Sequence, residues 1–251
     1  MIRATALIAL MLPATVGAEE RRTGYDDMSP ALQAMQDDPM NPGAFWVLEG
    51  ERRWSEPAGS TGQSCADCHG SAEISMRGVA ARYPAWDEGS SAPVDLSGRI
   101  VLCQIRHQGI ADFQDGADPG RLALLAYLAY QSRGMPIAPD PDPRLAPARA
   151  IGEALFSTRM GQLNLSCAQC HDDNAGGFLA SARIPQAHPT GYPQYRLEWE
   201  TLGTLDRRLS SCMTGVRAEP FQPGSADMVA LQLFLMSRAA GLTLEALPIR
   251  P

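Results

Sequence analysis

The stretches "SCADCH", residues 64–69, and "SCAQCH", residues 166–171, decide the fold. Each contains Cys-x-x-Cys-His, the attachment motif of c-type haem. Two cysteines three residues apart lie on one side of a helical turn, where they can form thioethers to the two vinyl groups of one porphyrin. The histidine that follows them can then bind the iron as its proximal ligand.

The two motifs predict two covalently bound haem c groups. The predicted attachment residues are Cys65, Cys68, Cys167 and Cys170, and the predicted proximal iron ligands are His69 and His171. A zinc site or a thioredoxin-like redox pair also uses Cys-x-x-Cys. Zinc, however, needs a second cysteine or histidine pair for each motif. The same adjacent histidine in both motifs favours haem.

The chain repeats itself around these motifs. Gly50-Glu51 and Gly152-Glu153 each stand fifteen residues before the first cysteine of a motif. Downstream, the apolar stretches 121–133 and 227–238 both end in Ser-Arg and have helical spacing. The pattern predicts a mostly α fold of two class I-like cytochrome c domains related by internal duplication.

A proline-rich stretch, "PIAPDPDPRLAPA" at 136–148, separates the two halves. Because proline cannot continue a helix, we expect an extended linker there. The first domain is then expected over 44–135 and the second, catalytic domain over 149–251. An N-terminal arm over 19–43 precedes them.

Residues 1–18, "MIRATALIALMLPATVGA", have the charged start, apolar run and small-residue end of a cleaved signal peptide. A membrane anchor would need roughly 18 or more consecutive apolar residues, and no later stretch of the chain is that long either. The sequence therefore predicts export to the periplasm, with no membrane span. The net charge of −7 argues against nucleic acid as a partner. Export also permits disulfides, so all six cysteines need an assignment.

The two remaining cysteines, Cys103 and Cys212, occupy equivalent positions in the repeat. Aligning "VDLSGRIVLC", 94–103, with "GTLDRRLSSC", 203–212, gives Arg-(Ile/Leu)-x-x-Cys in both halves. The arginine lies one helical turn before the cysteine and therefore on the same face of the helix.

Three interpretations of this cysteine pair stay open on the residues alone. The two thiols could form a disulfide if the domains bring their Cα atoms within about 7 Å, or they could be buried and inert. Alternatively, each thiolate is the sixth ligand of its own haem iron, helped to ionise by the nearby arginine. Electron carriers commonly use methionine instead, but no methionine occupies matching places in both halves. The candidates are Met135, Met160 and Met213.

Histidines offer a further alternative in the first half only. His107 stands four residues after Cys103 and could ligate the first haem, but it has no counterpart in the second half. His188 lies in a loop-like stretch, "AHPTGYP".

With both haem motifs, both distal cysteines and "RRLSSCM" at 207–213, the sequence resembles the SoxA family of dihaem cytochromes, subunits of the SoxAX complexes of sulfur-oxidising bacteria. The resemblance covers nearly the whole chain after the signal peptide. "RRLSSCM" is its specific part, because Cys-x-x-Cys-His alone occurs in any c-type cytochrome. Some members of the family lack the first haem, whereas this chain keeps the full first motif.

The resemblance implies an enzyme, a haem-dependent L-cysteine S-thiosulfotransferase. It forms a heterodimer with a small monohaem SoxX-type cytochrome and oxidatively joins thiosulfate to a cysteine of a SoxYZ-type carrier protein. The electrons pass through haem to an external cytochrome c.

The resemblance also assigns roles to residues of the second domain. Cys212 and His171 would ligate the catalytic haem, and Cys212, a persulfide in this family, would be the sulfur-bonding centre. Arg208 would bind the substrate, because a guanidinium offers the thiosulfate dianion a fork of charge-assisted hydrogen bonds. It could instead be solvated or pair with a haem propionate. Cys103 would ligate the first haem opposite His69.

Two other functions remain open on the residues alone. One is a dihaem electron-transfer protein without a bond-making role. The other is a dihaem peroxidase, which would need an open iron position that the two distal cysteines would close.

Overall fold

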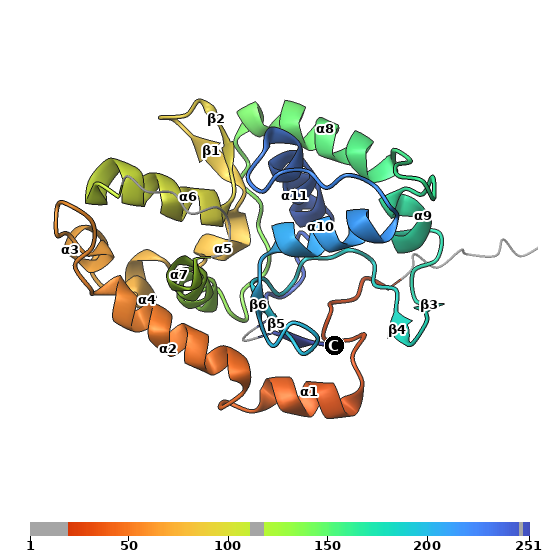
Figure 1. The fold of residues 1–251 in the computed structure, drawn as a ribbon, viewed down its shortest axis with the longest axis horizontal. Coiled ribbons are helices and arrows are strands. Elements are labelled where there is room, and N and C mark those ends of the chain that lie inside the picture. The colour runs from red at the N-terminus through yellow and green to blue at the C-terminus, as the bar shows by residue number, and fades with distance from the viewer. Residues whose placement is uncertain (1–19, 111–117, 246–247) are drawn as a thin grey trace, which may run out of the picture.

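The computed structural model describes residues 20–110, 118–245 and 248–251, so the predicted signal peptide lies outside the described residues. The fold is mostly helical, as predicted, and its elements fall into two similar sets. In Figure 1 the first set, coloured orange to yellow-green, lies beside the second, coloured green to blue. None of the helices in the described ranges is long and apolar enough to cross a membrane.

The first half begins with a long helix and closes with another. Its elements are α2 (Pro42–Trp54), α3 (Cys65–His69), α4 (Ala72–Ser75), α5 (Val79–Arg82), β1 (Ala85–Asp87), β2 (Ala92–Val94), α6 (Leu96–Cys103), a π-helical turn (Gln104–Gln108) and α7 (Pro119–Tyr130).

The second half repeats the long helices, the motif helix and the hairpin before the next-to-last helix; it has the hairpin β3–β4 where the first half has α4 and α5, and it ends in a further strand. Its elements are α8 (Ala146–Ser157), α9 (Cys167–His171), β3 (Phe178–Leu179), β4 (Ala182–Arg183), β5 (Gln194–Arg196), β6 (Thr201–Gly203), α10 (Leu205–Gly215), α11 (Ala226–Arg238) and β7 (Ile249–Arg250).

A glycine brings the first and last helices of each half into close contact. α2 packs against α7, and α8 packs against α11. A Cβ atom at Gly50 would lie 2.1 Å from the Ala123 carbonyl oxygen, and one at Gly152 would lie 2.0 Å from that of Ala230. Any side chain there would push the paired helices apart. The repeated glycine is therefore required by the repeated helix pair.

A short hairpin leads into the next-to-last helix of each half. β1 pairs antiparallel with β2, with Ala85 opposite Val94. β5 pairs antiparallel with β6, with Gln194 opposite Gly203. The two hairpins thus have the same length and register, and α6 and α10 start at equivalent points after them.

The predicted linker is extended in its first part and helical at its end. The Ile137 side chain is buried, and its backbone N–H donates to the Leu242 carbonyl over 2.8 Å. A 3-10 turn covers Pro143–Leu145, and α8 begins at Ala146, three residues before the expected start of the second domain. Pro147 stands in the first turn of α8, where a missing N–H breaks no helical hydrogen bond.

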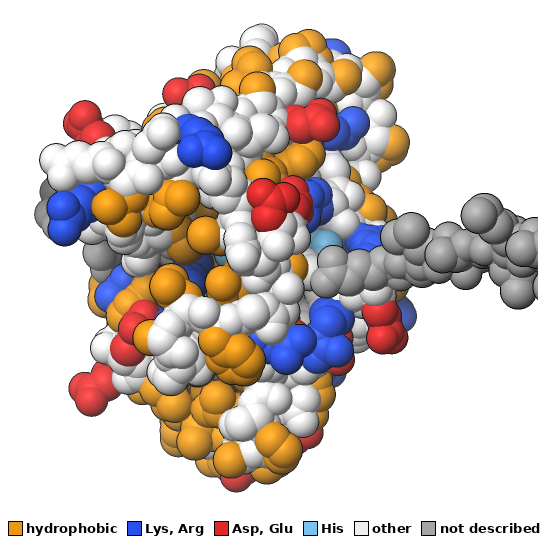
Figure 2. All heavy atoms as spheres, turned by 90° about the vertical axis from the view of Figure 1, so that its right-hand side faces the viewer, with side chains coloured by type: hydrophobic (Ala, Val, Ile, Leu, Met, Phe, Trp, Pro, Cys, Tyr) orange, Lys and Arg blue, Asp and Glu red, His pale blue; other side chains and the backbone are white. Residues whose placement is uncertain are grey.

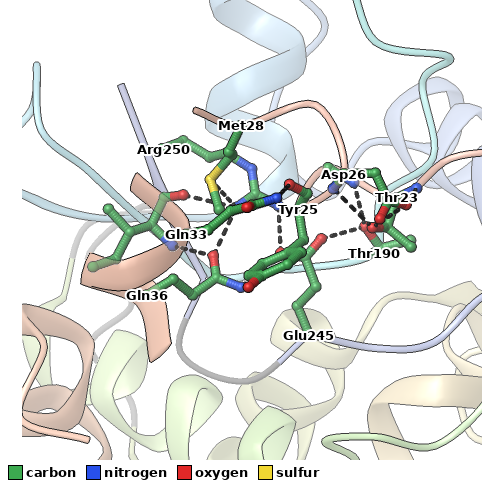
Figure 3. A network of polar contacts seen from close by, with 11 residues as sticks. Thr23, Tyr25, Asp26, Met28, Gln33, Gln36, Thr190, Glu245 and Arg250 are labelled. Carbon is green, nitrogen blue, oxygen red and sulfur yellow. Dashed lines mark hydrogen bonds and ion pairs between the residues drawn. The ribbon is translucent and has the colours of Figure 1, made fainter. Parts of the chain in front are cut away.

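The N-terminal arm contains one helix, α1 (Pro30–Asp37), and is held by the second half. The Gln36 side chain accepts hydrogen bonds from the Ile249 N–H (3.0 Å) and the Arg250 guanidinium (2.9 Å) and donates to Glu245 (3.1 Å). Figure 3 shows this network, in which the Thr190 hydroxyl also donates to Glu245 over 2.6 Å. The arm therefore ties the C-terminal strand of the second half to α2 of the first.

A buried pair of carboxyl groups joins the starts of α6 and α10. Asp95 caps α6 and Asp206 lies in the first turn of α10. The Gln232 side-chain amide of α11 donates to both, at 3.3 Å to Asp95. Burial raises the pKa of Asp95; burial together with the neighbouring Asp95 charge raises that of Asp206 to about 7. These three side chains line a cavity that is also lined by Tyr83 and Tyr192.

This carboxyl pair predicts a pH-dependent stability. A raised carboxyl pKa means that the folded chain binds the proton more tightly than the unfolded chain does. The resulting stabilisation is complete below the unfolded pKa near about 4 and is lost as the pH rises through about 7. We expect the free energy of unfolding of Asp206→Asn, measured with urea, to fall less between these pH values than that of the unsubstituted protein. The exposed Glu153→Gln is the control, and equal slopes for Asp206→Asn and the unsubstituted protein would show that the pair does not titrate.

Candidate haem sites

A capping box orients each Cys-x-x-Cys-His motif. In α3 the Ser64 hydroxyl accepts from the Asp67 N–H (3.1 Å), and the Asp67 carboxylate accepts from the Ser64 N–H (2.7 Å). Ser166 and Gln169 make the same reciprocal pair at the start of α9, over 3.3 and 3.0 Å. These bonds satisfy free N–H groups of the first turn and fix its direction. Both motifs therefore present their cysteines from an equally braced helical turn.

The first motif opens onto a cavity of about 360 Å³. Apolar side chains of α5, α6 and α7 form much of its lining, including Val79, Ile100 and Leu128. All four residues that the sequence assigns to the first haem line this cavity: Cys65, Cys68, His69 and Cys103. An apolar cavity with the motif on one side and a thiol on another has the residues that haem c needs.

His107 lines the same cavity as Cys103. It lies on the π-helical turn that follows α6. Both distal-ligand candidates therefore face the first cavity, and the alternative that the sequence left open stays open.

In the second half, His171 is held in the orientation that an iron ligand needs. Its Nδ1 lies 2.7 Å from the Pro185 carbonyl oxygen, so Nδ1–H donates and Nε2 is left for a metal. Burial lowers the pKa of His171, as does the positive charge of Arg208. Both effects favour the neutral imidazole, the form that ligates iron.

Each distal cysteine lies near the first cysteine of its own motif. Burial and, to a smaller extent, the nearby Cys212 raise the pKa of Cys167 to about 11. Cys65 has a raised pKa for the same two reasons, burial and the nearby Cys103. The residues of both halves thus fit a haem between a motif histidine and a cysteine.

No disulfide joins Cys103 and Cys212 in the structure, so the pairing that the sequence left open is not formed. Met213 is buried, and its sulfur accepts from the Phe221 N–H over 3.5 Å. The Nδ1 atom of His188 lies 2.8 Å from the Arg22 carbonyl oxygen, so this histidine holds the N-terminal arm.

The arginines that precede the two distal cysteines have different surroundings. Arg99 forms an ion pair with the Asp87 carboxylate over 2.6 Å and donates to the Tyr83 hydroxyl over 3.1 Å. Arg208 is half-buried and has neither an ion pair nor a side-chain hydrogen bond with any residue in the described ranges. The second site therefore holds a guanidinium that can receive an anion.

Two tyrosines near these arginines were not predicted from the sequence. Tyr83 and Tyr192 each precede a proline and stand twenty residues before the distal cysteine of their half. This repeated "YP" is the signal that could have found them. Pro185, which orients His171 through a backbone carbonyl, left no signal, because any residue supplies that group.

The surface beside the second motif mixes apolar and charged side chains. β3 exposes Phe178 and Leu179 at 68% and 73%. Figure 2 shows the side of the molecule on which α9, β3 and β4 lie, where hydrophobic side chains lie among basic and acidic ones. All the basic ones are arginines, because the chain contains no lysine.

The model of the SoxA/TsdA cytochrome c domain matches this chain twice, over residues 49–137 and 151–244. The chain belongs to the SoxA/TsdA cytochrome c domain family. It is therefore built of cytochrome c domains, whose haem is covalently attached, in agreement with the two motifs.

Relatives in this family align with most of the chain. The L-cysteine S-thiosulfotransferase subunit SoxA of Pseudaminobacter salicylatoxidans is 34% identical over 211 residues, 84% of this chain and 73% of that protein. The same subunit of Rhodovulum sulfidophilum is 33% identical over 233 residues, 92% of this chain and 81% of that protein. In the crystal structure of SoxXA from P. pantotrophus, one chain matches with a TM-score of 0.87 at 32% identity, covering 92% of this chain and 87% of that one.

The first SoxA/TsdA domain offers a direct test of its distal ligand. We expect Cys103→Ala to change the visible absorption of the first haem while the haem content stays the same, because the thioethers do not involve this thiol. The matched variant is His107→Ala, which should leave the spectrum nearly unchanged. The reverse pattern would make His107 the ligand.

Proposed function

We propose that this chain is the SoxA-type subunit of a haem-dependent L-cysteine S-thiosulfotransferase. It joins thiosulfate to a cysteine of a SoxYZ-type carrier protein. The observation that carries this proposal is Arg208, a guanidinium without a counter-charge among the described residues, one helical turn before the thiol of Cys212. The names of the relatives support the same activity.

The reaction is an oxidative coupling of two sulfur atoms. The terminal sulfur of thiosulfate bonds to the sulfur of the carrier cysteine, whose S–H bond breaks. The product is a cysteine S-thiosulfonate, with one proton and two electrons released. Bound haem c supplies the route by which these electrons pass, one at a time, to an external cytochrome c.

Arg208 holds and orients the anion in this proposal. A guanidinium can donate two parallel hydrogen bonds to two oxygens of one sulfonate group, which fixes the direction of the terminal sulfur. From its place on α10 the arginine would present that sulfur to Cys212. Cys212 would then be the sulfur-bonding centre, and His171, oriented by the Pro185 carbonyl, would hold the haem iron through its Nε2.

We further propose two haem c groups per chain. His69 and Cys103 would ligate the first iron, and His171 and Cys212 the second. The matching capping boxes and the thiol beside each motif support this assignment. The domain boundaries given above and export to the periplasm belong to the same proposal.

The partner in this proposal is a small monohaem SoxX-type cytochrome. The similar crystal structure is of a SoxXA complex. The exposed apolar pair Phe178 and Leu179, close to the second motif in the sequence, supports docking of a protein on that side. The SoxYZ-type carrier must reach the same haem, so we expect the partner to leave Cys212 accessible.

Substitutions at Cys212 and Arg208 test the proposed function. Cys212→Ala removes the thiol, and Cys212→Met keeps a sulfur ligand but no ionisable thiol, so thiosulfate conjugation should collapse in both while the haems stay attached. Arg208→Lys keeps the charge but loses the fork, and should lower kcat/KM for thiosulfate by about tenfold. The measurement is the rate of thiosulfate-dependent modification of the carrier cysteine, by mass spectrometry.

Cys103→Ala is the matched control, because it removes the equivalent thiol of the first half. Most of the conjugation activity should remain in this variant. A near-normal rate in Cys212→Ala would instead make the chain an electron-transfer cytochrome without a bond-making role.

A further inference from the structure

The repeat places one pair of residues with opposite charges at the same position in the two halves. Asp87 ends β1 and lies opposite Ala92 in the first hairpin. Arg196 ends β5 and lies opposite Thr201 in the second. Each stands sixteen residues before the distal cysteine of its half. Arg196 therefore occupies in the second half the place that Asp87 occupies in the first.

In the first half this place carries a carboxylate that bridges two arginines. The Asp87 side chain is 3% exposed and accepts from Arg99 over 2.6 Å and from Arg106 over 2.8 Å. Hydrogen bonds from Arg106 and Ser90 hold the pKa of Asp87 well below its ordinary value. The Asp87 carboxylate therefore occupies the position between Arg99 and Arg106 at every physiological pH, and no room for an external anion is left between them.

In the second half the equivalent position, Arg196, carries a positive charge in addition to that of Arg208. The Arg196 side chain is only 12% exposed, and its ion pair is with the half-exposed Glu198, over 2.8 Å. Burial lowers the pKa of Arg196, and the positive charge of Arg208 lowers it further. The two guanidiniums are thus close enough to repel each other.

The charges of both guanidiniums act on the same half-buried tyrosine, Tyr192. Burial raises the pKa of Tyr192 to about 12, and the charges of Arg208, Cys212 and Arg196 all act on this residue. The repeat supports this placement, because Asp87, at the position equivalent to Arg196, contacts Arg99, at the position equivalent to Arg208. The carboxylate of Glu198 pairs with Arg196, whereas Arg208 has no carboxylate partner among the described residues, and no carboxylate bridges the two arginines there.

Two like charges in a half-buried position cost free energy unless an anion binds between them, because the interior screens charge less than water does. The first half avoids this cost with Asp87. In the second half the repulsion between Arg196 and Arg208 is not relieved by a bridging carboxylate. Arg208 lies one helical turn before Cys212, the thiol that the proposed function uses. Such an arrangement is expected where the missing negative charge arrives with a ligand.

We propose that Arg196 is the second arm of the substrate clamp, so that Arg196 and Arg208 together hold a small divalent oxyanion of sulfur beside Cys212. Asp87 prevents the first half from binding the same anion, which makes the second haem site the only one of the two that selects substrate. This inference rests on the proposed function and adds a specificity-determining residue to it.

The test places the negative charge of Asp87 at the equivalent position of the second half, Arg196. In the complex with its cytochrome partner, Arg196→Asp should raise the KM for thiosulfate at least tenfold and leave kcat at saturating thiosulfate within about threefold. Arg196→Lys should retain most of the affinity. Arg159→Asp, an exposed change of the same net charge, is the matched control and should leave KM unchanged.

A second readout does not depend on turnover. Titration calorimetry with sulfate, an unreactive dianion, should show binding to the unsubstituted complex and at least tenfold weaker binding to Arg196→Asp. If Arg196→Asp does not fold with its haems, Arg196→Gln removes the charge more gently and should weaken sulfate binding in the same direction.

The outcomes separate this inference from the proposed function. If the unsubstituted complex conjugates thiosulfate and Arg196→Asp keeps its KM and its sulfate affinity, the second arm is wrong and the proposed function stands. A changed haem spectrum with unchanged affinity would assign Arg196 to a haem propionate and also overturn the inference. If the unsubstituted complex binds sulfate through Arg196 but conjugates nothing, the clamp stands and the proposed function fails.

Discussion

In each half of the chain, a guanidinium is held one helical turn before a thiol, on a helix that starts directly after a hairpin. The residue at the end of the first hairpin strand decides what that guanidinium can do. In the first half it is Asp87, whose carboxylate pairs with Arg99 over 2.6 Å. In the second half it is Arg196, and Arg208 is left without an ion pair among the described residues. One side chain thus separates a structural arginine from one that can bind an anion.

This difference has an effect only because the two halves are otherwise built alike. Gly50 and Gly152 allow the close packing of equivalent helix pairs in the two halves, and the capping boxes fix equivalent motif turns. The buried carboxyl groups of Asp95 and Asp206 join the starts of the two distal helices through Gln232. The duplication keeps the geometry constant while the charge changes.

Much of this could be predicted from the sequence. The haem motifs, the duplication and the Arg-x-x-x-Cys pattern are spacings between particular residue types. Such spacings can be read directly from the sequence. The hairpins could not be predicted, because strands of three residues are too short to show an alternation of apolar and polar side chains. Asp87 and Arg196 were missed for that reason. The start of α8 inside the proline-rich stretch was missed because Pro147 is compatible with a first helical turn.

The claim on which the other assignments depend is that a cysteine thiolate faces the motif histidine across each haem. Electron paramagnetic resonance of the oxidised, unsubstituted protein tests it most directly, because low-spin iron with a histidine and a thiolate ligand differs in its g values from iron with histidine and methionine. We predict two low-spin signals of the histidine/thiolate type, one for each haem. A histidine/methionine signal, or a high-spin signal from an iron with an open position, at the second haem would contradict the role given to Cys212.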